Sequence, residues 1–151
     1  MECPSGSESA LPGRRPLLSQ RARYALKALI HLAQAGGGPE RSPAIAAAIN
    51  APPKFLEMIL RELKSAGLVT SSRGRAGGFA LAKSASAISL GDIVRATDGP
   101  IALVACASRL FYARCADCDE TTCALRKAMV TVRDATAALL DGFTLERAAA
   151  G

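Results

Sequence analysis

Three stretches of the first half of the chain repeat apolar residues at helical spacing. The first predicts a helix over 19–35, which a run of glycines at 36–38 ends. The second predicts a short helix over 42–49, with Ser42 as its N-cap. After a tight turn, the third predicts a longer helix over 53–67.

The third predicted helix has two distinct faces. Its large apolar residues recur at i, i+3, i+4 and i+7, so we expect them to face the core: Leu56, Ile59, Leu60 and Leu63. Charged residues share the opposite face: Lys54, Glu57 and Arg61. A short helix, a tight turn and a longer helix with an exposed polar start are typical of a helix-turn-helix, whose second helix enters the major groove of DNA.

A β-hairpin is predicted directly after these helices. Residues 68–72 and 79–82 have strand composition, and a glycine-rich turn over 73–78 joins them. Arg73 and Arg75 lie at its tip. After a helix-turn-helix, such a hairpin is a wing whose arginines suit a narrow minor groove, although an ordinary hairpin with two solvated arginines has the same pattern.

The second half of the chain predicts two more helices. Ser89 and Asp92 form a capping box that starts a short helix ending near Gly99. A long helix is expected from about Thr122 to Leu140, with a cap at Gly142. Its apolar stripe is too short for a free coiled coil, so we expect it to pack on other helices. The stripe consists of Leu125, Met129, Val132, Thr136 and Leu139.

Charge is distributed unevenly along the 151 residues. Residues 14–75 hold 11 Lys or Arg and three acids, a net charge of +8, whereas residues 76–151 hold eight of each sign. A basic half next to a neutral half favours a polyanionic partner such as double-stranded DNA, although a solvated basic surface is the simpler explanation of charge alone. The length fits one domain, and 50% hydrophobic with only 4% aromatic residues suits a helical protein.

Several classes of protein are disfavoured. No apolar run reaches the roughly 18–20 residues of a membrane helix, and residues 1–19 lack the apolar segment of a secretion signal, so we expect a cytoplasmic protein without membrane contact. Residues 1–17 have the composition of a disordered extension, in which Cys3 is incidental. With one histidine, His31, and no recognisable catalytic motif, we do not expect an enzyme.

Four of the five cysteines fall within 18 residues: Cys106, Cys115, Cys118 and Cys123. Clustered thiolates are soft ligands that suit an iron–sulfur cluster or zinc. Structural disulfides are disfavoured because they need an oxidising compartment. A Cys-x-x-Cys redox pair is also disfavoured, because it belongs in a βαβ unit, which is not predicted here. A redox dithiol, scattered structural thiols and an electron carrier remain the alternatives to a metal-binding sensor.

Several motifs together resemble one family. They are LSQRARYA at 18–25, FLE at 55–57, GLV at 67–69, RG at 73–74, GGF at 77–79 and ISLGDIV at 88–94. In this order they resemble the winged-helix regulators typified by IscR and NsrR, the Rrf-two family, from about Leu18 to Leu145. The resemblance implies a homodimeric transcription regulator, often a repressor, whose affinity for its DNA operator responds to an iron–sulfur cluster.

The resemblance also assigns roles to residues. It places operator contacts on Phe55 and Glu57 and a minor-groove contact on Arg73. Base chemistry adds further candidates, because a carboxylate accepts from cytosine and basic side chains reach phosphate or guanine. The full predicted DNA-binding set is Lys54, Phe55, Glu57, Arg61, Arg73 and Arg75.

The predicted sensor departs from the family pattern. Where well-known members carry a ligating histidine three positions after the last cysteine, this chain has Arg126, which cannot ligate a metal. A fourth cysteine is present instead, so iron–sulfur and zinc both remain open.

The resemblance assigns the dimer contact to the long helix. We therefore expect a DNA-binding domain over 18–99, a cysteine-rich sensor loop over 100–123 and a dimerisation helix over 124–145.

Overall fold

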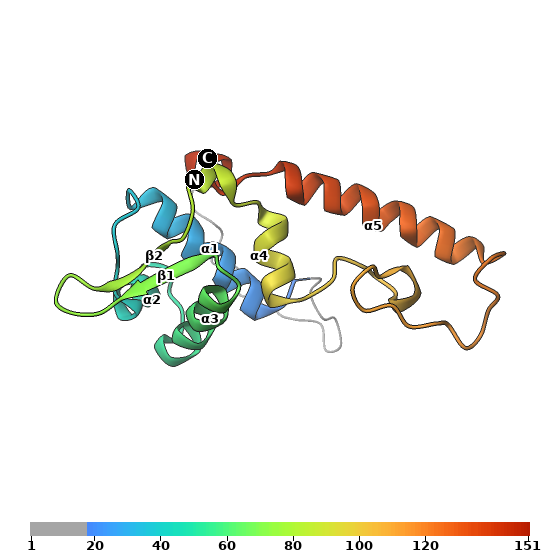
Figure 1. Ribbon diagram of the computed structural model, residues 1–151, viewed down its shortest axis with the longest axis horizontal. Coiled ribbons are helices and arrows are strands. Elements are labelled where there is room, and N and C mark those ends of the chain that lie inside the picture. The colour runs from blue at the N-terminus through green and yellow to red at the C-terminus, as the bar shows by residue number, and fades with distance from the viewer. Residues whose placement is uncertain (1–17) are drawn as a thin grey trace.

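The computed structural model describes residues 18–151 and is mainly helical with one small hairpin (Figure 1). This confirms the predicted fold class; the predicted extension 1–17, with Cys3, lies outside the described residues. In chain order the elements are α1 Gln20–Gln34, α2 Ser42–Ala48, α3 Pro53–Ser65, β1 Val69–Ser72, β2 Gly78–Leu81, the 3-10 helix η1 Ala85–Ala87, α4 Leu90–Thr97, the 3-10 helix η2 Ala105–Ala107, α5 Ala124–Gly142 and α6 Leu145–Ala150.

One hydrophobic core holds α1, α2, α3, α4 and α6 together. The predicted inner face of α3 is confirmed, because all four of its apolar residues are fully buried. Leu29 and Leu32 of α1, Ile45 of α2 and Ile93 of α4 are fully buried in the same cluster. Burying a side chain of this size contributes about 1.5–3 kcal/mol, so this cluster fixes the position of α3.

The helix ends confirm some of the predicted caps and correct others. Ser19 caps α1 by accepting from the Ala22 N–H at 3.0 Å, and the Ser89–Asp92 capping box starts α4. The prediction of Ser42 as an N-cap is wrong: α2 begins at Ser42 itself, and the preceding arginine is the cap residue without a side-chain bond. The predicted cap at Gly142 is also wrong, because Gly142 keeps helical geometry as the last residue of α5.

The predicted wing is confirmed as an antiparallel pair of strands. Val69 pairs with Leu81 at one end and Ser72 with Gly78 at the other. Glu40, just before α2, adds an edge to this hairpin through backbone bonds of 2.8 and 2.9 Å to Phe79. The wing is therefore attached to the helix-turn-helix through both strands: β1 follows α3 in the chain, and β2 is bonded to the segment before α2.

The C-terminal helices behave differently from each other. None of the residues of α5 is buried, and in Figure 1 this helix projects away from the body of the molecule. The prediction that its stripe packs on other helices is wrong for the single chain, where Leu125, Val132 and Leu139 are 63%, 40% and 76% exposed. The sequence did not predict α6, which returns to pack on α1 and fully buries Leu145. Within residues 18–151, no helix has the length and apolar character to cross a membrane.

Candidate DNA interface and cysteine loop

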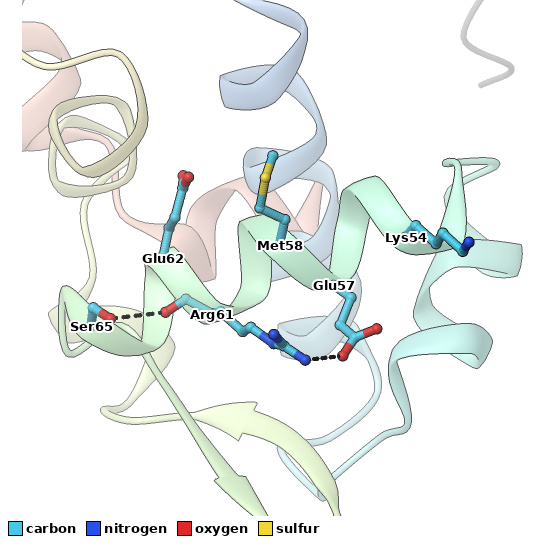
Figure 2. A pocket seen from close by; sticks show the side chains of 6 residues that line it. All are labelled: Lys54, Glu57, Met58, Arg61, Glu62 and Ser65. Carbon is cyan, nitrogen blue, oxygen red and sulfur yellow. Dashed lines mark hydrogen bonds and ion pairs between the residues drawn. The ribbon is translucent and has the colours of Figure 1, made fainter.

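The exposed face of α3 forms a shallow hollow of about 330 Å³. Figure 2 shows its lining residues: Lys54, Glu57, Met58, Arg61, Glu62 and Ser65. The Arg61 guanidinium donates to the Glu57 carboxylate at 2.6 Å, one helical turn away. Both groups are largely exposed, so the pair stabilises the helix little and both side chains remain available for other partners.

Phe55 occupies a different position from the other predicted residues of α3. Its ring is half-buried against the core and meets Tyr24 of α1 edge to face, with centroids 6.0 Å apart and planes at 79°. Such aromatic pairs stabilise by about 0.5–1.5 kcal/mol beyond burial. Phe55 therefore holds the start of α3 against α1.

A second hollow, of about 360 Å³, lies between α3 and the wing. Glu57 of α3 lines both hollows, so it connects the exposed face of this helix with the hairpin. Lys64 of α3 donates to Ser71 of β1 at 2.6 Å, which ties the helix to the hairpin. The predicted wing arginines, Arg73 and Arg75, are both exposed in the turn.

Two features of this second hollow escaped the sequence analysis. Arg41 lines it and points its guanidinium at the Gly74 carbonyl, 3.5 Å away. Gly77 and Gly78 are glycines for a steric reason: a Cβ on either would collide with backbone, of Ser72 and Arg73 for Gly77 and of Glu40 for Gly78. Recognising Arg41 required knowing that the segment before α2 folds against the wing.

The four clustered cysteines lie along one continuous segment. Cys106 is in η2, Cys115 and Cys118 are in the following loop, and Cys123 is the N-cap of α5. All four are half-buried free thiols. The end of the loop is anchored by Asp119, whose carbonyl accepts from the Cys123 N–H at 2.9 Å.

Three of these thiols interact. Hydrogen bonding of the Cys118 thiol with Cys115 and with Cys123 raises the pKa of Cys118 to about 12. The pKa of Cys123 is lowered, first by the backbone N–H of Arg126, which donates to its sulfur at 3.4 Å, and then by Cys118. Cys118 is thus the thiol that keeps its proton, and Cys123 is the better thiolate.

Cys106 is attached to the same region by Arg126, whose Nε donates to the Cys106 carbonyl at 3.1 Å. Four thiols are suitable donors for a soft metal, but within residues 18–151 no group of three or more Cys, His, Asp or Glu side chains is arranged to hold a metal ion. Two of the loop acids are engaged elsewhere: Asp119 accepts from the Thr121 hydroxyl at 2.8 Å, and Glu120 accepts from the Tyr112 hydroxyl at 2.5 Å. The donor chemistry fits a metal, whereas the described geometry is not a formed ligand set.

A three-helix joint connects this loop to α3. Arg21 of α1 donates to the carbonyl of Thr97, the last residue of α4, at 2.6 Å, and to Glu62 of α3 at 3.3 Å. Asp98, next in the chain, accepts from the Ser19 N–H at 2.8 Å and so fastens the same end of α4 to the start of α1. The segment leading to the cysteines begins directly after this joint.

A second joint connects α4 to α5. Arg95 makes a two-pronged ion pair with Asp141, with bonds of 2.7 and 2.8 Å. The Arg95 guanidinium lowers the pKa of Asp141 below its ordinary value. Gly91 faces this pair, and a Cβ there would collide with the Asp141 carboxylate. The cysteine-bearing segment therefore begins at the end of α4, and the far end of α5, the helix that follows Cys123, is bonded back to α4.

Comparison with known proteins agrees with this architecture. Residues 18–151 match the family model of Rrf2, an iron-dependent transcriptional regulator. An Rrf2-like HTH-type transcriptional regulator of Rhodobacter capsulatus is 42% identical over 135 residues, covering 86% of this chain and 90% of that protein.

Two solved structures share the fold. CymR, the global cysteine regulator of B. subtilis, has 34% identity and a TM-score of 0.73 over 90% of this chain and 98% of its own. T. potens IscR has 28% identity and a TM-score of 0.66 over 90% of this chain and 86% of its own. The chain therefore belongs to the Rrf2 family of winged-helix transcriptional regulators.

Proposed function

We propose that this regulator binds operator DNA as a homodimer and represses transcription. We further propose that the chemical state of its four clustered cysteines sets its affinity for the operator. The first candidate for that state is an iron–sulfur cluster held by Cys106, Cys115, Cys118 and Cys123. The observation that carries the proposal is the position of α4, which is bonded through Arg21 to the helix with the exposed charged face, α3, and leads directly into the thiol-rich segment.

The proposed DNA contacts are Lys54, Glu57 and Arg61 on α3, with Arg73 and Arg75 on the wing. All are exposed or half-exposed; the three residues of α3 line the first hollow, and the two wing arginines are in the turn that contributes Gly74 and Gly77 to the second. Phe55 contributes to the same interface by holding α3 in place through Tyr24. Arginine and lysine supply phosphate and groove contacts, while the Glu57 carboxylate is the group suited to a cytosine amino group.

The proposed dimer forms through α5. This helix of 19 residues buries none of them in the single chain, yet Leu125, Val132 and Leu139 expose apolar surface along it. In proteins most of the stability of a helix comes from packing of its apolar face rather than from helix propensity, so α5 needs a partner surface. A second copy of the chain meets that need and presents two reading helices to consecutive turns of DNA.

Coupling between cysteines and DNA would run through α4. A cluster bound by the cysteine segment would order it and move α5, which follows it, relative to α4. The start of the segment is fixed to α1 and α3 by Asp98 and Arg21, and the far end of α5 is fixed to α4 by Arg95–Asp141. A small rotation of α4 would then reorient α3 in each half of the dimer.

The test is anaerobic, iron-replete purification followed by an ultraviolet–visible spectrum and analysis of iron, zinc and sulfide. We expect a coloured protein with equal iron and sulfide, whose affinity for a selected DNA duplex changes when the cluster is removed. Each single Cys→Ser change in the set should remove most of the absorbance, and Cys3→Ser is the matched control that should remove none. Colourless protein with stoichiometric zinc would refute the cluster and favour a zinc-stabilised regulator.

A thiol switch is the second candidate, and the mutual hydrogen bonding of Cys118 with Cys115 and Cys123 favours it. Cys118 and either Cys115 or Cys123 could lose two protons and two electrons to hydrogen peroxide, which is reduced to two waters, and form a disulfide. Metal-free protein whose DNA affinity changes on peroxide treatment and returns with a dithiol reductant would support this switch. Retention of that response in Cys118→Ser would refute it.

A further inference from the structure

The exposed face of α3 carries one large apolar side chain among its charged groups. Met58 is 45% exposed and lines the hollow with Lys54, Glu57 and Arg61. The inner face of the helix is formed by other positions, which are fully buried. Met58 is therefore not part of the core. Met58 belongs to α3, which Figure 1 shows on the body of the molecule apart from the projecting α5, so it lies on a different surface from the exposed stripe of that helix.

Three of the four charged residues that line this hollow are in ion pairs. Glu57 is bonded to Arg61 at 2.6 Å on one side of the helix, and Glu62 is bonded to Arg21 of α1 at 3.3 Å on the other. Figure 2 shows the Met58 side chain rising from α3 on the same side as Glu62, away from the Glu57–Arg61 pair. An apolar side chain thus separates two neutralised ion pairs on the face that the proposed function turns toward DNA.

The major groove offers one apolar group, the C5-methyl of thymine; the other base edges present hydrogen-bond donors and acceptors. A thioether side chain cannot donate, accepts weakly, and is flexible enough to fit an irregular surface. We propose that Met58 is a specificity-determining residue that packs on a thymine methyl group in each half of the operator. This inference rests on the proposed DNA-binding function of α3.

The size of the effect follows from the area of one methyl group. Burying a group of this size is worth about a fourfold change in affinity. We therefore expect that removing the thymine methyl at the contacted position weakens binding about three- to tenfold. The loss should be confined to one thymine, or two adjacent ones, in each half-site.

The experiment starts from a duplex that the wild-type protein selects from a random library. Each thymine is then replaced singly by deoxyuridine, which removes only the methyl group, and affinity is measured by fluorescence anisotropy at fixed salt. Met58→Ala should bind the thymine duplex more weakly by a similar factor and should no longer distinguish thymine from deoxyuridine at that position. Met58→Leu, which keeps an apolar end, should retain the distinction.

A third variant separates loss of contact from loss of structure. Met58→Gln keeps the length of the side chain but makes its end polar, and it should also lose the distinction while circular dichroism shows a folded protein. If the wild type selects no DNA sequence, the proposed function fails and this inference with it. If it selects a sequence but every deoxyuridine substitution is neutral, or if Met58→Ala still prefers thymine, only the role of Met58 is overturned.

Discussion

The packing of α6 on α1 allows a stringent test of the fold, because α6 lies far along the chain from α1 and yet completes its hydrophobic core. Leu145 is fully buried, its N–H donates to the Ile88 carbonyl at 2.8 Å, and Leu90 donates back to Phe143 at 2.9 Å. Replacing Leu145 by alanine removes most of its apolar volume and leaves a cavity against α1. At fully buried sites this change costs about 2–5 kcal/mol, which is a large part of a total stability of roughly 5–15 kcal/mol.

In a chain of this length, about 3 kcal/mol corresponds to a decrease in Tm of roughly 6–12 °C. We expect Leu145→Ala to show that decrease in thermal and urea unfolding followed by circular dichroism, with a value that does not depend on protein concentration. Leu139→Ala is the matched control, since Leu139 is 76% exposed in the single chain. Its effect should appear only through dimerisation and should therefore vary with concentration.

Equal and small effects of the two leucine substitutions would refute this account of the core. So would a Leu145→Ala protein of normal stability that loses only its dimer, because Leu145 would then belong to an interface between chains. A large, concentration-independent loss for Leu145→Ala with little change for Leu139→Ala in dilute protein supports the packing of α6 on α1.

Three further predictions concern the proposed DNA contacts, the exposed stripe of α5 and the Arg95–Asp141 pair. Glu57→Ala should relax base preference at one operator position by about 1–3 kcal/mol, whereas Arg73→Ala should weaken binding to most sequences and reduce its salt dependence; anisotropy that is unchanged for both would remove these residues from the interface. Val132→Glu places a charge on the α5 stripe and should give monomers by light scattering, so a dimer of normal stability would contradict it. Asp141→Asn should lower unfolding free energy at pH 7 by at most about 1 kcal/mol, since the pair with Arg95 is solvent-screened. Because the folded pKa of Asp141 is depressed, this difference is fully present above the unfolded pKa of about 3.9 and is lost as the pH falls from there through the lower folded pKa; a difference that does not shrink as the pH falls below the unfolded pKa would be inconsistent.

Much of the fold could be predicted because its signals are local. The inner face of α3 follows from spacing within two turns, the wing from a glycine-rich turn between strand segments, and the start of α4 from Ser89 and Asp92, three positions apart. Each of these signals involves residues close in sequence, where a physical rule ties residue type to conformation.

The features that were missed depend on contacts between distant residues. Arg21 meets Thr97 and Glu62 across 76 and 41 positions, and Arg95 meets Asp141 across 46. An arginine on a helix is usually solvated, and the residues next to it in the sequence do not indicate a bonding partner that is 40 or more positions away. The short helix α6 has too little periodicity to stand out, and its role comes from packing on α1 rather than from propensity.

The candidate sites divide in the same way. Lys54, Glu57 and Arg61 could be placed on one exposed face from helical spacing, and the structure agrees. Phe55 is on the same helix, but spacing alone could not show that its ring is directed to Tyr24. For the cysteines, the sequence established their density but not their geometry, because irregular loops are set by bonds such as the one from Arg126 to the Cys106 carbonyl.

Arg126 also affects the surroundings of the cysteines in the proposed sensor. It stands where the resemblance implied a ligand, and it cannot bind a metal, yet it contacts Cys106 and Cys123 and so brings the start and the end of the cysteine segment together. A positive side chain at this place offsets charge on thiolates without occupying a coordination position. Under the proposed function, the fourth cysteine and the arginine are one change: the ligand would be supplied from within the loop, and the position in α5 would become an electrostatic support for it.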